Sequence, residues 1–193
     1  MGALPVSVVI VSRGRPGALS LCLTGVAQLD HPAYEVIVVG CPEGVATVAA
    51  RPDADRIKRV AFDAPNISEA RNLGIAEAAG EVIAFLDDDA VPEPTWLAHL
   101  CAPFADPQVA AAGGYVRGRN GIDHQWRAQG VTARAQERDL PIEGTEPRIL
   151  HGRPGVAVKL QGTNMAHRRS VLAEMGGFDP AFRFFLDETD LDM

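Results

Sequence analysis

The chain has 193 residues, of which 47% are hydrophobic and 22% charged, and its formal net charge is −7. A chain of this length can bury one core, so we expect a single domain over 1–193. This negative net charge argues against a nucleic-acid partner, because binding a polyanion needs a basic face. Three widely separated cysteines disfavour a disulfide framework and fit a cytoplasmic protein. No apolar run is long enough to be a transmembrane segment, which leaves a peripheral membrane association open.

The first 62 residues alternate between short apolar runs and helical patterns. Runs rich in β-branched residues predict strands at 6–11, 35–39 and 57–62. Helices are predicted between them, from 16 to about 29 and over 45–50. This alternation predicts an α/β fold with a Rossmann-like, mostly parallel sheet and helices on both faces.

A capping signal begins the next predicted helix, over 66–80. Asn66 and Glu69 have the spacing of a capping box, and Gly80 is expected to end the helix in a left-handed conformation. Gly74 lies inside the helix, where glycine costs about 1 kcal/mol relative to alanine. We therefore expect Gly74 to pack closely against a neighbouring element.

Three carboxylates, Asp87, Asp88 and Asp89, directly follow a predicted buried strand at 81–86. Open α/β sheets bind their ligands at the carboxyl ends of such strands. Adjacent like charges repel one another, and a hard divalent cation shared with a diphosphate would relieve that repulsion. A solvated acidic loop is the alternative.

The second half of the chain has weaker patterns. After a helix at 96–104, the segment 109–116 predicts a strand in which two glycines indicate a bulge or a close backbone approach. From 117 to 153 we expect a long loop region in which only 125–138 has a helical pattern. Further elements are expected in this order: strands at 156–160 and 164–167, a helix at 170–175, and a second acidic cluster opening another helix near the end.

Four blocks resemble the family 2 glycosyltransferases, which have the GT-A fold. They are VVIVS at 8–12, ARNLG at 70–74, FLDDD at 85–89, and GGFD at 176–179 leading to DETDL at 187–191. Their order and spacing make the resemblance specific, and it covers nearly the whole chain. The resemblance implies a GT-A domain with a nucleotide-sugar-binding half at 1–116. It also implies an acceptor-side half at 117–193 that is truncated at its carboxyl end relative to the family.

The activity implied by this resemblance is metal-dependent, inverting transfer of a sugar from a nucleotide diphosphate to an acceptor hydroxyl. A UDP-sugar is the favoured donor. GDP- and dTDP-sugars stay open, because the aspartate with which the family contacts uracil is missing at Gly40 and Cys41. The acceptor would be a saccharide, a lipid-linked carrier, a protein or a small molecule. A non-catalytic domain that binds nucleotide sugars, or a truncated inactive relative, is the alternative.

The resemblance also implies roles for the first acidic cluster and its surroundings. Asp89 would ligate Mn²⁺ or Mg²⁺, and Asp87 would face the ribose or a metal-bound water and share the ion, so loss of Asp89 should be worse than loss of Asp88. The expected donor-binding residues are Ser12, Arg13, Arg15, Arg71, Asp87, Asp88, Gly162 and Asn164.

The second acidic cluster would supply the catalytic base. By resemblance Glu188 removes the proton of the acceptor hydroxyl, and Asp187 positions it or raises its pKa. The family more often has Glu-Asp than Asp-Glu here, so Asp187 and Asp190 stay open as alternatives. From the residues alone, an acidic helix N-terminus favoured by the helix dipole is the simpler interpretation.

Overall fold

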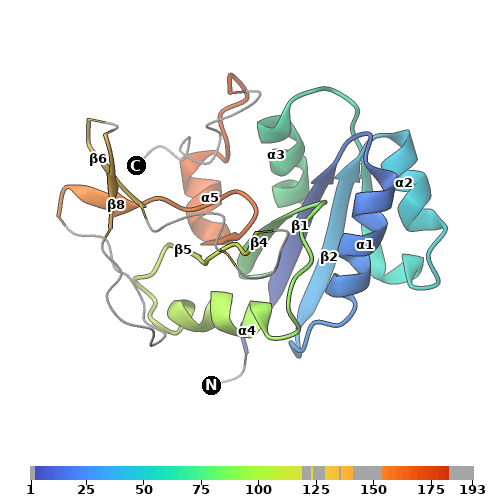
Figure 1. Ribbon diagram of the computed structural model, residues 1–193, viewed down its shortest axis with the longest axis horizontal. Coiled ribbons are helices and arrows are strands. Elements are labelled where there is room, and N and C mark those ends of the chain that lie inside the picture. Colours follow the sequence, from blue (N-terminus) through green and yellow to red (C-terminus); the bar gives the residue numbers. More distant parts are fainter. Residues whose placement is uncertain (1–2, 119–122, 124–128, 135, 141–153, 183–193) are drawn as a thin grey trace.

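A six-stranded sheet forms the centre of the protein (Figure 1). The computed structural model describes residues 3–118, 123, 129–134, 136–140 and 154–182. In spatial order the strands are β3 (Ile57–Ala61), β2 (Tyr34–Gly40), β1 (Val6–Ser12), β4 (Val82–Asp87), β9 (Met165–Arg168) and β5 (Ala111–Gly113). The first four are parallel, and β9 runs antiparallel to both β4 and β5. The predicted mostly parallel α/β sheet is confirmed.

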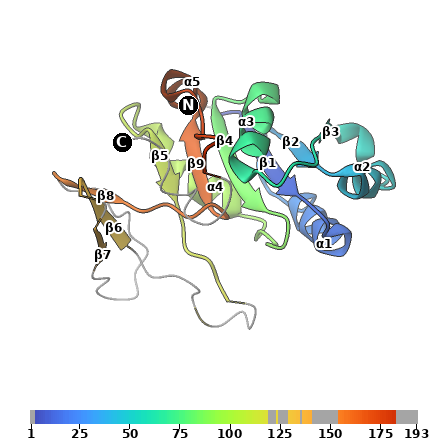
Figure 2. The same cartoon turned by 90° about the horizontal axis from the view of Figure 1, so that it is seen from above.

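Helices cover both faces of this sheet (Figure 2). One layer contains α1 (Pro16–Val26), α2 (Pro42–Ala49) and α4 (Trp96–Cys101), and the other contains α3 (Ile67–Glu77) and α5 (Arg169–Met175). Alternate residues of a strand face opposite layers, so Val8 lies in the core under α1 and Val9 in the core under α3. Each fully buried side chain of this kind contributes about 1.5–3 kcal/mol.

Several boundaries differ from the sequence prediction. The helix predicted at 45–50 already begins at Pro42, a residue favoured in the first helical turn. The helix predicted at 96–104 becomes a 3₁₀ turn at Ala102–Ala105, because Pro103 has no amide hydrogen to donate. A second 3₁₀ turn at Ala54–Arg56 precedes β3. None of the helices in the described ranges is long and apolar enough to cross a membrane.

Gly80 does not end α3, so that prediction was wrong. The helix ends at Glu77, and Gly80 is not among the described glycines with positive φ. Instead, a Cβ on Gly80 would lie 2.6 Å from the backbone nitrogen of Ser7 and 2.8 Å from the carbonyl carbon of Val6. Glycine is needed here because two backbones meet. The expected close packing of Gly74 is confirmed, since a Cβ there would contact Cγ1 of Val9.

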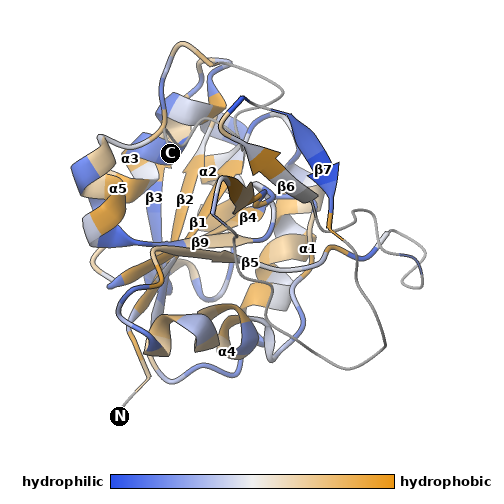
Figure 3. Cartoon of the chain, turned by 90° about the vertical axis from the view of Figure 1, so that its left-hand side faces the viewer, coloured by the Kyte–Doolittle hydropathy of each residue, from blue (hydrophilic) through white to orange (hydrophobic). Residues whose placement is uncertain are grey.

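A small second sheet replaces the helix predicted over 125–138, which is wrong for the described residues. Its order is β7 (Glu137–Asp139), β6 (Gln129–Thr132) and β8 (Val156–Val158). The Thr132 hydroxyl accepts hydrogen bonds from the amides of Arg134 and Gln136 and so stabilises the β6–β7 turn. β7 is strongly hydrophilic (Figure 3). Pairing with β8, distant in sequence, outweighs the local helical pattern.

Candidate active site

The acidic loop and the loop after β1 meet at the same edge of the sheet. β1 and β4 are parallel neighbours in a register that pairs Val11 with Asp87. Their following residues therefore leave the sheet side by side at its carboxyl edge, where this class of sheet binds ligands. The structure brings Ser12 and Arg15 to the acidic cluster, although the sequence analysis did not predict contacts between them.

Arg15 bridges two of the three carboxylates. Its Nη2 lies 2.6 Å from Oδ1 of Asp88, and its Nη1 donates to Oδ2 of Asp89 at 2.8 Å. The Asp88 side chain is fully buried, whereas that of Asp89 is 37% exposed. Burial raises the pKa of Asp88, and the Ser12 hydroxyl and the Arg15 charge oppose that rise. Asp88 therefore faces the protein interior, and Asp89 faces solvent.

Arg71 is a buried cation behind the acidic edge. Only 3% of it is exposed, and its guanidinium lies over the rings of Phe85 and Phe178, 5.8 and 5.2 Å from their centroids. Burial raises the pKa of Asp87, and the positive charge of Arg71 is the first effect that opposes this rise. Arg71 thus favours the ionised form of Asp87.

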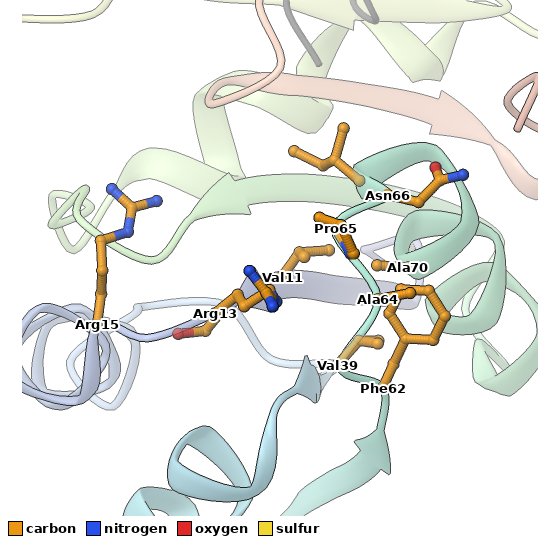
Figure 4. Close-up of a pocket in the computed structure, with 11 residues that line it drawn as sticks. Val11, Arg13, Arg15, Val39, Phe62, Ala64, Pro65, Asn66 and Ala70 are labelled. Carbon is orange, nitrogen blue, oxygen red and sulfur yellow. The ribbon is translucent and has the colours of Figure 1, made fainter. Parts of the chain in front are cut away.

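A cavity of about 190 Å³ lies beside this edge. Figure 4 shows its lining, in which Arg15 extends away from the other side chains. The walls are mostly apolar, and Arg13 donates from Nε to Oδ1 of Asp63 at 3.1 Å next to them. Phe62 and Pro65 were not predicted as site residues, although their position just after β3 places them at the carboxyl edge. The lining consists of Val11, Ser12, Arg13, Arg15, Val39, Phe62, Ala64, Pro65, Asn66, Ile67 and Ala70.

The turn before β9 also reaches the acidic loop. Thr163, which sequence analysis did not select, hydrogen-bonds through its side chain to Asp87, and this bond partly opposes the rise that burial causes in the pKa of that carboxyl. Its neighbour Gly162 is buried. The side-chain Oδ1 of Asn164 accepts a hydrogen bond from Nε1 of Trp96, and its Nδ2 donates to the carbonyl of Tyr115, each at 2.9 Å. Asn164 therefore fixes the turn, and these contacts were not predicted.

Side chains of α3 and of its N-cap residue hold the backbone that follows α5. Asn72 donates to the carbonyl of Phe178 at 2.7 Å and accepts from its amide at 2.8 Å. Asn66 donates to the carbonyl of Pro180 at 2.9 Å, and Ser68 to the carbonyl of Phe182 at 2.7 Å. This clamp attaches residues 178–182 to the helix whose first turn lines the cavity. Asp187, Glu188 and Asp190 lie outside the described residues.

Asn72→Ala tests the clamp. It removes two hydrogen bonds and leaves the amide and carbonyl of Phe178 without these partners, so the free energy of unfolding should fall by about 2–3 kcal/mol. Urea denaturation measures the loss, and hydrogen exchange at the Phe178 amide should accelerate. Gln28→Ala, which truncates an exposed amide, should change stability by less than about 0.5 kcal/mol. Equal stability of the two variants would contradict a clamp.

The acidic edge has two carboxylates, those of Asp87 and Asp89, that could hold a divalent cation together with a ligand. Within the described ranges, no three His, Cys, Asp or Glu side chains form a metal-binding group. Mg²⁺ and its analogues in phosphate sites need only one or two carboxylates, because the phosphates supply other oxygens. Asp89 is exposed and Asp87 half-buried, so both are accessible enough to serve.

The strand order, the antiparallel β9 and the acidic loop after β4 define an α/β domain of the GT-A type. Within that class, Glycosyltransferase like family 2 matches residues 4–193, and the chain belongs to this family. The sequence is 26% identical over 205 residues to the O-antigen biosynthesis protein RfbC of Myxococcus xanthus, covering 100% of this chain. It is 29% identical over 183 residues to the pre-mycofactocin glycosyltransferase of Mycobacterium tuberculosis, covering 90% of this chain.

Two solved structures illustrate the shared fold. TarS 1-349 of S. aureus in complex with UDP-GlcNAc superposes with a TM-score of 0.69 at 16% identity, over 97% of this chain and 52% of that one. The mannosyltransferase PcManGT of Pyrobaculum calidifontis, in complex with GDP-Man and Mn²⁺, gives 0.67 at 20% identity, over 92% and 48%. The chain spans 16% of the length of RfbC and 35% of that of the pre-mycofactocin enzyme.

Proposed function

We propose that the chain carries the donor site of a glycosyltransferase that moves a sugar from a nucleotide diphosphate to an acceptor hydroxyl. The observation that carries the proposal is the meeting of the β1 loop with Asp87, Asp88 and Asp89 beside a largely apolar cavity. A flat base needs an apolar cavity, and an anionic diphosphate needs an edge that can hold a cation. These two environments lie next to each other here. Family membership and the nucleotide sugars bound by TarS and PcManGT support the same assignment.

The cavity is proposed to receive the base. Val11, Val39 and Phe62 offer apolar surface for a flat ring, and Arg13 and Asp63 stand at the side with polar groups. The Asp63 carboxylate is 59% exposed and can accept a hydrogen bond from a ring N–H. A UDP-sugar remains the favoured donor, with GDP- and dTDP-sugars as alternatives.

The acidic edge is proposed to bind the diphosphate through a divalent cation. A bound Mn²⁺ or Mg²⁺ would stabilise the negative charge that develops on the leaving diphosphate. Asp89 and Asp87 would hold the ion, and Thr163 orients Asp87 through its hydrogen bond. Arg71 contributes a positive charge that favours the ionised form of Asp87.

The acceptor side is proposed on the family resemblance. Glu188, with Asp187 or Asp190 as the alternative, would remove the proton of the acceptor hydroxyl as it attacks the anomeric carbon. Attack on the face opposite the leaving group inverts that carbon. The α3 clamp supports this assignment, since it holds residues 178–182, which precede the acidic cluster, beside the helix that lines the cavity. A saccharide, a lipid-linked carrier or a small molecule would supply the hydroxyl.

A panel of nucleoside diphosphates in thermal denaturation tests the donor site. With Mn²⁺ present, one diphosphate at about 100 times its dissociation constant should stabilise the protein by about 2.7 kcal/mol. EDTA should abolish most of that shift, and the order of UDP, GDP and dTDP would assign the base. If no diphosphate raises the melting temperature with Mn²⁺ or Mg²⁺, the donor-site assignment is refuted.

A further inference from the structure

Arg15 provides a positive charge to the acidic edge from within the protein's own chain. Its two terminal nitrogens contact different carboxylates, 2.6 Å from Asp88 and 2.8 Å from Asp89. A guanidinium can bridge in this way because its donors form a rigid fork. Arg15 and a divalent metal would therefore interact with the same carboxylate, that of Asp89.

The two contacts of Arg15 differ in strength. Asp88 is fully buried, and a buried carboxylate that loses its partner is costly. Asp89 is 37% exposed and Arg15 is 52% exposed, and ion pairs between exposed groups contribute little. The contact with Asp88 should therefore persist, while the contact with Asp89 can be exchanged.

The position of Arg15 allows that exchange. Its carbonyl accepts the Leu19 amide at the start of α1, so the backbone is fixed by the helix. The half-exposed side chain can still pivot at the mouth of the cavity, from which it extends in Figure 4. A diphosphate bound at this edge would offer anionic oxygens to the nitrogen that leaves Asp89.

We propose that Arg15 is a built-in counterion that competes with the divalent metal for Asp89 and transfers to the diphosphate when metal and nucleotide bind together. The proposal rests on the proposed donor site and adds a mechanism to it. Metal alone must displace the Arg15 nitrogen from Asp89 without giving that nitrogen a new partner. Metal with nucleotide supplies that partner, so each ligand strengthens the binding of the other through Arg15.

Calorimetric titration of Mn²⁺, alone and with UDP, GDP or dTDP, measures this coupling. In wild type, nucleotide should strengthen Mn²⁺ binding by about tenfold or more. Arg15→Gln should bind Mn²⁺ alone about tenfold more tightly than wild type, because the competing cation is gone, and nucleotide should add less. Arg15→Lys should fall between them, since an ammonium does not bridge two carboxylates as a fork does. Arg117→Gln removes the same charge from an exposed pair with Glu93 and should leave the Mn²⁺ affinity near the wild-type value.

Thermal denaturation of the same variants gives a second readout. Without metal, Arg15→Gln should melt below wild type, because Asp88 loses its partner, and Mn²⁺ should raise its melting temperature more than that of wild type. If Arg15→Gln does not fold, the Mn²⁺ affinity of Arg15→Lys tests the proposal instead, and it should be higher than that of wild type.

An Mn²⁺ affinity in Arg15→Gln and Arg15→Lys equal to or below that of wild type would overturn the counterion proposal. Nucleotide binding by wild type in the same experiment would then leave the donor site intact. Conversely, a wild type that binds Mn²⁺ but none of UDP, GDP and dTDP would refute the donor site, while tighter Mn²⁺ binding by Arg15→Gln would still show the competition at Asp89.

Discussion

Asp89→Asn is expected to slow sugar transfer by about 10²–10³-fold, the loss typical when one group that stabilises transition-state charge is removed. The substitution keeps the size of the side chain and removes the charge that the proposed cation needs. Asp89 is the more exposed of the two carboxylates that Arg15 contacts, so the substitution should cost little stability. Release of nucleoside diphosphate from the nucleotide sugar measures the rate, and thermal denaturation with Mn²⁺ and nucleotide measures the binding.

Two further substitutions make this test specific. Asp55→Asn changes an exposed carboxylate in the 3₁₀ turn before β3 and should leave the rate near wild type. Asp88→Asn should slow transfer less than Asp89→Asn, because Asp88 is buried against Arg15 and does not face solvent. If Asp88→Asn were the more damaging to transfer, the assignment of Asp89 as metal ligand would be wrong.

Gly80→Ala is expected to lower the free energy of unfolding by about 3 kcal/mol, near the upper end of the range for overpacking a core. The added Cβ would lie 2.6 Å from the Ser7 nitrogen, and a backbone atom cannot rotate away as a side chain can. The buried hydroxyl of Ser7 accepts from the Gly80 amide at 2.9 Å and donates to Glu35 at 2.6 Å. Moving Gly80 would therefore also disturb a buried polar network, which makes partial relief costly.

Gly17→Ala provides the matched control. Gly17 lies in the first turn of α1, and a Cβ there would meet no atom within 4 Å. The free energy of unfolding of the Gly17→Ala variant should be unchanged or higher by up to about 1 kcal/mol, because alanine has a higher helix propensity than glycine. Urea denaturation compares the two variants. A Gly80→Ala protein as stable as Gly17→Ala would show that β1 and the α3–β4 connection do not meet as closely as described.

The sequence alone was sufficient to predict the four parallel strands of the central sheet. Buried parallel strands such as Val6–Ser12 and Val82–Asp87 are recognised in the sequence as mostly apolar runs. The start of a helix is indicated by a capping residue such as Asn66. The predicted capping bond is present, with the Glu69 amide donating to Asn66 at 3.1 Å. The acidic cluster was placed at the edge of the sheet because a strand's carboxyl end is fixed once the strand is recognised.

The tertiary structure decided which partners these residues take. The pairs that form the site join residues far apart in the chain, such as Arg15 with Asp89 and Asn72 with Phe178. No local periodicity encodes such a pair, because it depends on strand order and register. For the same reason the sequence predicted a helix where β6 pairs with β8, and a helix stop where Gly80 contacts β1. Local patterns determined the elements, whereas long-range packing determined the close contacts and the charge pairing of the acidic edge.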